Sequence, residues 1–180
     1  MRFVLVMLVS VTLLGCDRPQ VQRTLPTVDA SQLAPEAVVA IDRATKAVLD
    51  NPNSASAWST LGVYYQSHGL YKAAVQAYFA AQSFSKEPAQ TAYWLGLSLA
   101  KLGRYEEAIA ACSQYENYVP AIWRQGYWLL DLGRIDEAAI KFQNALQVDP
   151  NAVAAMVGLV RVRLQQQRES EAIELLENII

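Results

Sequence analysis

Few side chains in this 180-residue sequence are of the types that perform acid–base or covalent chemistry. His68 is the only histidine, and it stands beside Gly69 in an expected tight turn, where no second group is placed to orient its ring. Cys16 and Cys112 are the only cysteines and have no neighbouring histidine, so we expect no metal site and no cofactor. We expect no enzyme, since the titratable groups available to one are only Asp131, Lys101 and Arg161.

The first residues have the pattern of an export signal. Arg2 is followed by an uncharged run over residues 3–14, and then by Gly15 and Cys16. A membrane-spanning helix needs about twenty apolar residues, so this run is too short to span a bilayer and fits the apolar core of a secretory signal. We therefore expect residues 1–15 to be a signal peptide.

The sequence Leu13-Leu14-Gly15-Cys16 resembles the lipobox of bacterial lipoproteins. The resemblance implies cleavage between Gly15 and Cys16 and acylation of Cys16, which would anchor the protein because each buried methylene contributes about 0.8 kcal/mol. It further implies a lipid-anchored protein on a cell membrane, facing the periplasm or the exterior, and Asp17 favours the inner membrane. The alternative is an ordinary signal peptide followed by a chance cysteine.

Alanine and glycine recur through the rest of the chain. The alanines Ala74, Ala108, Ala138 and Ala172 are 34, 30 and 34 residues apart. Two columns of glycines keep the same register: Gly62, Gly96 and Gly126, then Gly69, Gly103 and Gly133. Such a period is typical of stacked helical hairpins, because one hairpin cannot bury its apolar face alone.

These repeats resemble the tetratricopeptide repeat. The first carries the pattern in full: Trp58, Leu61, Gly62, Tyr65, Gly69, Ala74, Tyr78, Ala81 and Pro88. The third has Gln125 where the pattern has leucine, and the fourth has Val160 and Gln167 where it has a small residue and a glycine. The resemblance implies an all-α fold, a right-handed superhelical solenoid of antiparallel helix pairs, with four repeats at about 53–88, 89–120, 121–152 and 153–180.

Two segments precede the repeats. Residues 16–34 are polar, contain prolines and show no periodicity, so we expect a flexible tether. Residues 35–52 are expected to hold one capping helix, which begins at Pro35 and covers the open side of the first hairpin.

The second repeat is shorter than the others. Ala74 to Gly96 spans 22 residues, as does Ala138 to Val160, whereas Ala108 to Gly126 spans only 18. The difference is about one turn of α-helix. We therefore predict a shortened second helix in this repeat and a local change in superhelical twist.

In tetratricopeptide repeats the first helix of each hairpin lines a concave groove. By this resemblance the groove residues are Tyr93, Leu97, Lys101, Trp123, Tyr127, Leu130 and Arg161. Aromatic and cationic side chains dominate binding energy at interfaces, so we predict binding of an extended peptide or an amphipathic helix. The alternative is that Trp123 and Trp94 pack as core beside the short repeat. Ser59 and Val63 replace the residues of a carboxylate clamp, so docking of chaperone tails is not expected.

The functional hypothesis is a membrane-anchored scaffold or assembly adaptor for cell-envelope proteins; the alternative is a periplasmic receptor for a short peptide or another extended ligand. A net charge of -2 without a basic stripe disfavours nucleic acid as a partner. Cys112 is expected to be a buried free thiol. For the last helix, either the natural chain continues, or its apolar residues meet a partner or, by self-association, a second copy of the chain: Ala172, Ile173, Leu175, Leu176, Ile179 and Ile180.

Overall fold

The computed structural model describes residues 24–29, 31 and 33–177. Every regular element within these ranges is an α-helix, which confirms the predicted all-α class. None of these helices has the length and apolar character needed to cross a bilayer. The helices are α1 (Pro35–Asp50), α2 (Ala55–Ser67), α3 (Tyr71–Gln82), α4 (Pro88–Lys101), α5 (Tyr105–Cys112), α6 (Val119–Asp131), α7 (Ile135–Val148), α8 (Val153–Gln165) and α9 (Glu169–Glu177).

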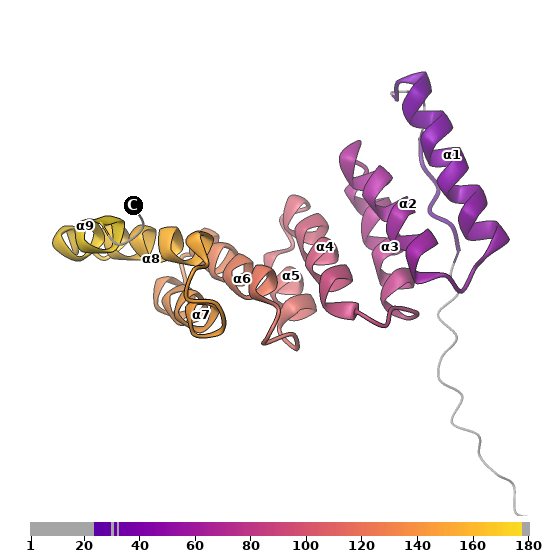
Figure 1. Ribbon diagram of the computed structural model, residues 1–180. Helices are drawn as coiled ribbons and strands as arrows, with labels where there is room; N and C mark the ends of the chain where they lie inside the picture. Colours follow the sequence, from indigo (N-terminus) through magenta and orange to yellow (C-terminus); the bar gives the residue numbers. More distant parts are fainter. Residues whose placement is uncertain (1–23, 30, 32, 178–180) are drawn as a thin grey trace, which may run out of the picture.

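The helices stack in series as a solenoid of paired helices. α2 packs on α3, α4 on α5, α6 on α7 and α8 on α9, while α1 packs on α2. Figure 1 shows α1 to α4 standing upright in the view and α8 and α9 lying across it, so helix direction turns along the solenoid. The predicted solenoid, with one additional helix ahead of the first hairpin, is confirmed.

A tight turn in the left-handed conformation joins the two helices of each hairpin. Gly69, Gly103 and Gly133 have φ angles of 73°, 74° and 75°, which glycine adopts without steric cost. Gln167 takes the same conformation in the last hairpin, with φ 59°. One of the two glycine columns in the sequence therefore marks these turns.

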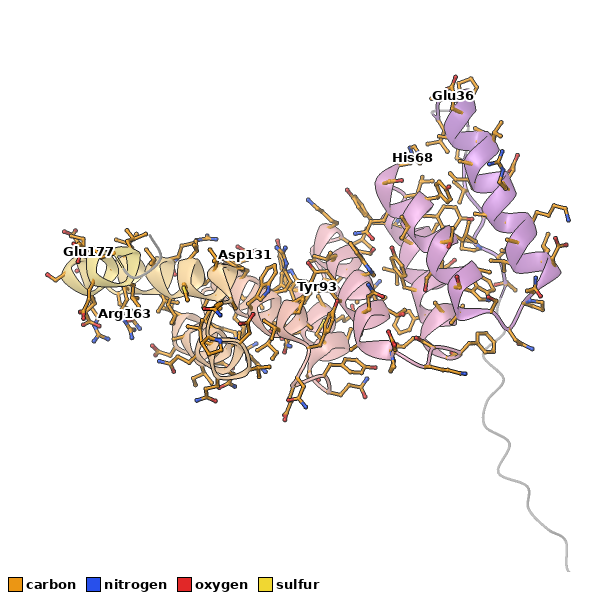
Figure 2. All side chains as sticks on the ribbon, viewed as in Figure 1. Glu36, His68, Tyr93, Asp131, Arg163 and Glu177 are labelled. Carbon is orange, nitrogen blue, oxygen red and sulfur yellow. The ribbon has the colours of Figure 1, made fainter. Side chains whose placement is uncertain are left out.

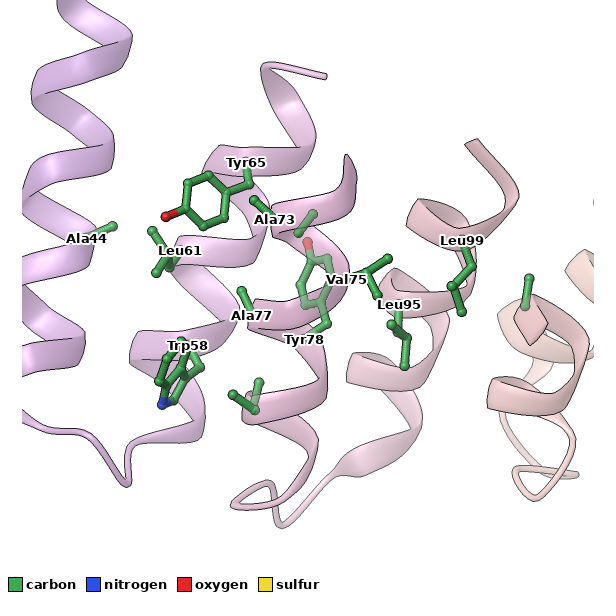
Figure 3. Close-up of a cluster of buried hydrophobic side chains, with 14 of the residues drawn as sticks. Ala44, Trp58, Leu61, Tyr65, Ala73, Val75, Ala77, Tyr78, Leu95 and Leu99 are labelled. Atoms are coloured by element: carbon green, nitrogen blue, oxygen red, sulfur yellow. The ribbon is translucent and has the colours of Figure 1, made fainter. Parts of the chain in front are cut away.

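The core runs continuously from one hairpin to the next. Figure 3 shows Trp58 and Leu61 of α2, Tyr78 of α3, and Leu95 and Leu99 of α4 in one buried cluster. The second glycine column lies where the paired helices approach most closely. A Cβ atom added at Gly62 would lie 2.7 Å from the Tyr78 ring, so only glycine lets α2 and α3 pack at this distance.

The second hairpin is built differently, because Cys112 stands where its neighbours have Tyr78 and Phe142. Its second helix, α5, has 8 residues, against 12 in α3 and 14 in α7, which confirms the predicted shortening. The space beside Gly96 is filled from the next repeat: an added Cβ would lie 2.6 Å from the ring of Trp128. The buried Trp128 on α6 thus joins the third hairpin to the second.

The Cys112 thiol is buried, as expected, and donates a hydrogen bond to the carbonyl oxygen of Ala92 at 3.5 Å. Burial raises the pKa of the thiol to about 12. Cys112 is therefore protonated at neutral pH, and its role is packing.

The last part of the segment expected to be a tether lies against the solenoid. Leu25, Val28 and Leu33 pack on the buried cluster of the first two hairpins, and Figure 1 shows this extended stretch beside α1. The expectation of a flexible tether throughout 16–34 is therefore wrong for its second half, because these apolar side chains pack on an apolar surface. Residues 16–23 lie outside the described residues, as do the signal peptide and the acylation site.

That apolar surface is particular to the first hairpin. Val28 faces Leu70, the residue that follows the turn glycine and lines the same hollow of about 320 Å³. The later repeats carry an arginine at this position: Arg104, Arg134 and Arg168. Because the first hairpin has leucine where the later hairpins have arginine, its edge carries no charge at this position. The preceding segment can therefore cover this edge.

Gln125 is the one buried glutamine of the described chain, at 2% exposure, and its amide is only half satisfied. Its Nε2 donates to the carbonyl oxygen of Ala121 at 3.2 Å, whereas its Oε1 has no hydrogen-bond partner. The other repeats have a buried leucine at this position: Leu61, Leu95 and Leu159. An unpaired buried carbonyl costs about 1–3 kcal/mol.

Restoring the leucine is therefore expected to stabilise the protein. We predict that Gln125→Leu raises the free energy of unfolding by about 1–2 kcal/mol, measured by urea denaturation followed by circular dichroism. The reciprocal variant Leu95→Gln introduces the same amide into the second hairpin and should lower it. A loss of stability in Gln125→Leu would show that the glutamine amide is satisfied in solution.

Candidate binding surface on the first helices

The predicted groove residues lie on α4, α6 and α8, the first helices of the last three hairpins. α4 contacts α6, and α6 contacts α8, so side chains from different repeats meet along one surface. Figure 2 shows the side chains on the whole solenoid and labels Tyr93 on α4 and Asp131 at the end of α6.

Four rings form a series across this surface, which we call the aromatic row: Tyr118, Tyr93, Trp123 and Tyr127. Successive ring centroids are 6.1, 6.5 and 5.9 Å apart, and each pair meets edge to face. This is the arrangement that the charge distribution of aromatic rings favours. All four rings are half-buried, so each is held by its neighbours and keeps part of its surface in solvent.

The end of the aromatic row is fixed to the core. The Tyr127 ring packs edge to face on the buried ring of Phe142, with centroids 5.0 Å apart. Its hydroxyl donates to the carbonyl oxygen of Ala154 at 2.9 Å, which ties α6 to α8. Burial raises the pKa of Tyr127, while Arg161 and Arg124 act in the opposite direction. The phenol is therefore neutral at physiological pH.

Two arginines stack on the aromatic row. The Cζ atom of Arg124 lies 4.5 Å from the centroid of the Trp123 ring, and that of Arg161 lies 5.4 Å from the centroid of the Tyr127 ring. Both distances fall within the range of cation–π attraction. The Nε of Arg124 is buried and has no hydrogen-bond partner, so this guanidinium keeps an unused donor.

The structure brings most of the predicted groove residues together. Tyr93, Leu97, Trp123 and Tyr127 are half-buried on adjacent helices, and Lys101 and Arg161 are exposed. Leu130 is the exception and has to be removed from the groove. It is only 5% exposed, because it packs in the hydrophobic cluster of α6 to α8.

The contacts of the tryptophans also exclude the alternative that Trp123 and Trp94 pack as core beside the short repeat. Trp128, and not Trp123 or Trp94, fills the space beside the short repeat. Trp94 is half-buried and meets Tyr93 edge to face at 5.3 Å, so it extends the aromatic surface on α4.

Arg124 and Tyr118 are members of this surface that the sequence analysis missed. Arg124 follows Trp123 directly and lies outside the stripe of residues three and four apart, and Tyr118 precedes α6. The sequence signal for Arg124 is that it is the only basic residue of α6. Among the described residues, no group of three or more His, Cys, Asp or Glu side chains is arranged to hold a metal ion.

Comparison with known proteins agrees with this architecture. A tetratricopeptide-repeat family model matches residues 129–180, and the family model of anaphase-promoting complex, cyclosome, subunit 3 matches residues 31–115. The first of these models assigns a tetratricopeptide repeat to residues 129–180. Superkiller complex protein 3 of Mus musculus is 30% identical over 103 residues, which cover 55% of this chain and 6% of that protein, so the chain spans only a small part of this relative.

Two solved structures show the same tetratricopeptide solenoid. The crystal structure of MamA has a TM-score of 0.70 at 19% identity, covering 80% of this chain and 86% of that one. YrrB, described as a TPR protein with an unusual peptide-binding site, has a TM-score of 0.62 at 26% identity, covering 81% of this chain and 77% of that one.

Proposed function

We propose that this tetratricopeptide solenoid is a scaffold that binds a segment of another protein on the surface formed by α4, α6 and α8. The observation that carries the proposal is the aromatic row with its two stacked arginines. Rings fixed by their neighbours lose little conformational freedom on binding, and aromatic and arginine side chains are the usual centres of binding energy. YrrB, the 26% identical neighbour whose description names a peptide-binding site, supports a peptide-like ligand.

The finer part of the proposal is its location. We propose that Cys16 is acylated and that the protein works as an assembly adaptor on the outer side of a bacterial cell membrane, with partners among cell-envelope proteins. The support is the Leu13-Leu14-Gly15-Cys16 motif. At no more than about 3.6 Å per residue, residues 17–23 would hold the first hairpin within about 30 Å of the lipid. Incorporation of a labelled fatty acid, lost in Cys16→Ser, tests this part.

A receptor for a short peptide remains the second candidate, and the description of YrrB favours it. The two functions differ in how much of the partner protein is needed for full affinity. A scaffold loses affinity when its partner is reduced to the contacting peptide, whereas a peptide receptor retains it.

Site-specific crosslinking tests where the partner binds. A photoreactive residue placed at Trp123 should crosslink the partner in cells. The same residue at Phe79 on α3, which is 52% exposed and belongs to a second helix, provides the matched control. Crosslinks from position 79 but none from position 123 would place the partner on the wrong helices for this proposal.

A further inference from the structure

The charges of the solenoid are segregated between its two rows of helices. The first helices of the hairpins, α2, α4, α6 and α8, carry one acidic residue, Asp131, and four basic ones: Lys101, Arg124, Arg161 and Arg163. The second helices, α3, α5, α7 and α9, carry two basic residues and eight acidic ones: Lys72 and Lys141, then Glu106, Glu107, Asp136, Glu137, Glu169, Glu171, Glu174 and Glu177. A chain of net charge -2 thus has basic first helices.

Several charges of the second helices are already paired within the protein. Arg134 binds Glu137 of its own repeat and Glu106 of the preceding one, at 2.5 and 2.9 Å. Arg163 of α8 binds Glu171 of α9 at 3.1 Å. The other three basic side chains of the first helices form no ion pair with any described residue: Lys101, Arg124 and Arg161.

Two of these cations stack on rings of the aromatic row. Arg124 is half-buried, its guanidinium stacks on Trp123, and its Nε is buried without an acceptor. An unpaired buried donor is costly, and a carboxylate is the acceptor that a guanidinium binds best. Arg161 stacks on the next ring of the aromatic row, so two cationic groups follow the same line as the rings.

We propose that the surface formed by α4, α6 and α8 selects an acidic peptide segment, whose carboxylates bind Arg124 and Arg161 and whose apolar side chains contact the aromatic row. This inference rests on the proposed binding function and adds the charge of the partner. The site differs from a carboxylate clamp for chaperone tails, since its cations come from the third and fourth repeats and Ser59 and Val63 occupy the clamp positions in the first.

The test uses the full chain purified in detergent and three synthetic peptides. The peptides share leucine and phenylalanine residues and carry glutamate, glutamine or lysine at the remaining positions. By fluorescence anisotropy, the glutamate peptide should bind at least about tenfold more tightly than the glutamine peptide, and the lysine peptide least tightly. This preference should shrink at high salt, because the arginine contacts are partly exposed.

Paired variants separate the acidic preference from binding itself. The double variant Arg124→Gln, Arg161→Gln should abolish the preference, so that the glutamate and glutamine peptides bind with equal affinity. Arg161→Gln alone, at an exposed position, should reduce the preference and leaves folding unaffected. Arg104→Gln removes a cation from the turn between α4 and α5, outside the binding surface, and should leave the affinities for all three peptides unchanged.

The outcomes are distinguishable. Equal affinity for the three peptides, lost in Trp123→Ala, would overturn the acidic preference and leave the binding function intact. Binding of the glutamate peptide that Trp123→Ala does not weaken would overturn both. No binding of any peptide would overturn the acidic preference, and crosslinking of the partner at Trp123 then tests the binding function separately. Binding of a single-stranded oligonucleotide through Arg124 and Arg161, without binding of the glutamate peptide, would show that the basic surface serves a nucleic acid instead.

Discussion

Replacing Phe142 by alanine is expected to lower the free energy of unfolding by about 3–5 kcal/mol. The Phe142 ring is fully buried between α6 and α8: Cβ atoms added at Gly126 and Gly158 would lie 2.6 and 2.3 Å from it. It also supports Tyr127 at the end of the aromatic row. Removing the ring leaves a cavity shared by three helices that cannot close it, since the glycines have no side chains to move inward. Urea denaturation followed by circular dichroism measures the loss.

The matched control is Phe79→Ala, which removes the same ring from a position that is 52% exposed. This variant should change the free energy of unfolding by no more than about 0.5 kcal/mol. Equal losses in the two variants would contradict the packing described for the third and fourth hairpins. Because repeats in a solenoid contact mainly their neighbours, hydrogen exchange in Phe142→Ala should accelerate most in α6 to α8.

Replacing Trp123 by alanine is expected to weaken partner binding about thirtyfold, which corresponds to about 2 kcal/mol. The indole lies between Tyr93 and Tyr127 in the aromatic row and carries the guanidinium of Arg124. The variant therefore loses a central contact surface and the platform that positions a cation. Titration of the partner, or of the glutamate peptide, by fluorescence anisotropy measures the change.

Phe79→Ala again provides the control, since it removes an exposed ring of a second helix and should leave the affinity unchanged. Trp123 is only half-buried, so the free energy of unfolding should fall much less in Trp123→Ala than in Phe142→Ala. Unchanged affinity in a folded Trp123→Ala variant would exclude the aromatic row as the binding surface.

The fold was predictable from the sequence because its signals are local and repeated. The glycine column of Gly69, Gly103 and Gly133 marks turns that need positive φ angles. The spacing of 18 residues between Ala108 and Gly126 indicates a missing helical turn before any coordinates are known. Both signals act within one or two hairpins, so a single sequence suffices to read them.

Other features depend on volumes and contacts that spacing does not encode. Trp128 fills the second hairpin only because Cys112 is small, and its ring comes from the next repeat. Leu25 and Val28 do not follow the period of a helix or a strand, so the sequence pattern could not predict that they pack on the first hairpin. Leu130 has the spacing of a groove residue, yet its neighbours bury it.

The charge of the binding surface was hidden for a different reason. The formal net charge of -2 averages over two rows of helices with opposite character. Arg124 and Arg161 become part of one basic surface only when α6 and α8 are assigned to the same row. The segregation of charge is present in the sequence, but it becomes visible only when each helix is assigned to the first or the second position of its hairpin.

The most direct measurement follows the tryptophan indole N–H signals in a ¹H–¹⁵N spectrum while the glutamate peptide is added. The indole of Trp58 donates to the carbonyl oxygen of Pro52 at 2.8 Å and is buried next to α1, away from the aromatic row, so it serves as an internal reference. The signal of Trp123 should shift, with that of Trp94 beside it, while the signal of Trp58 stays in place. Saturating peptide that leaves the Trp123 signal unmoved, or moves only that of Trp58, would contradict binding on the surface formed by α4, α6 and α8.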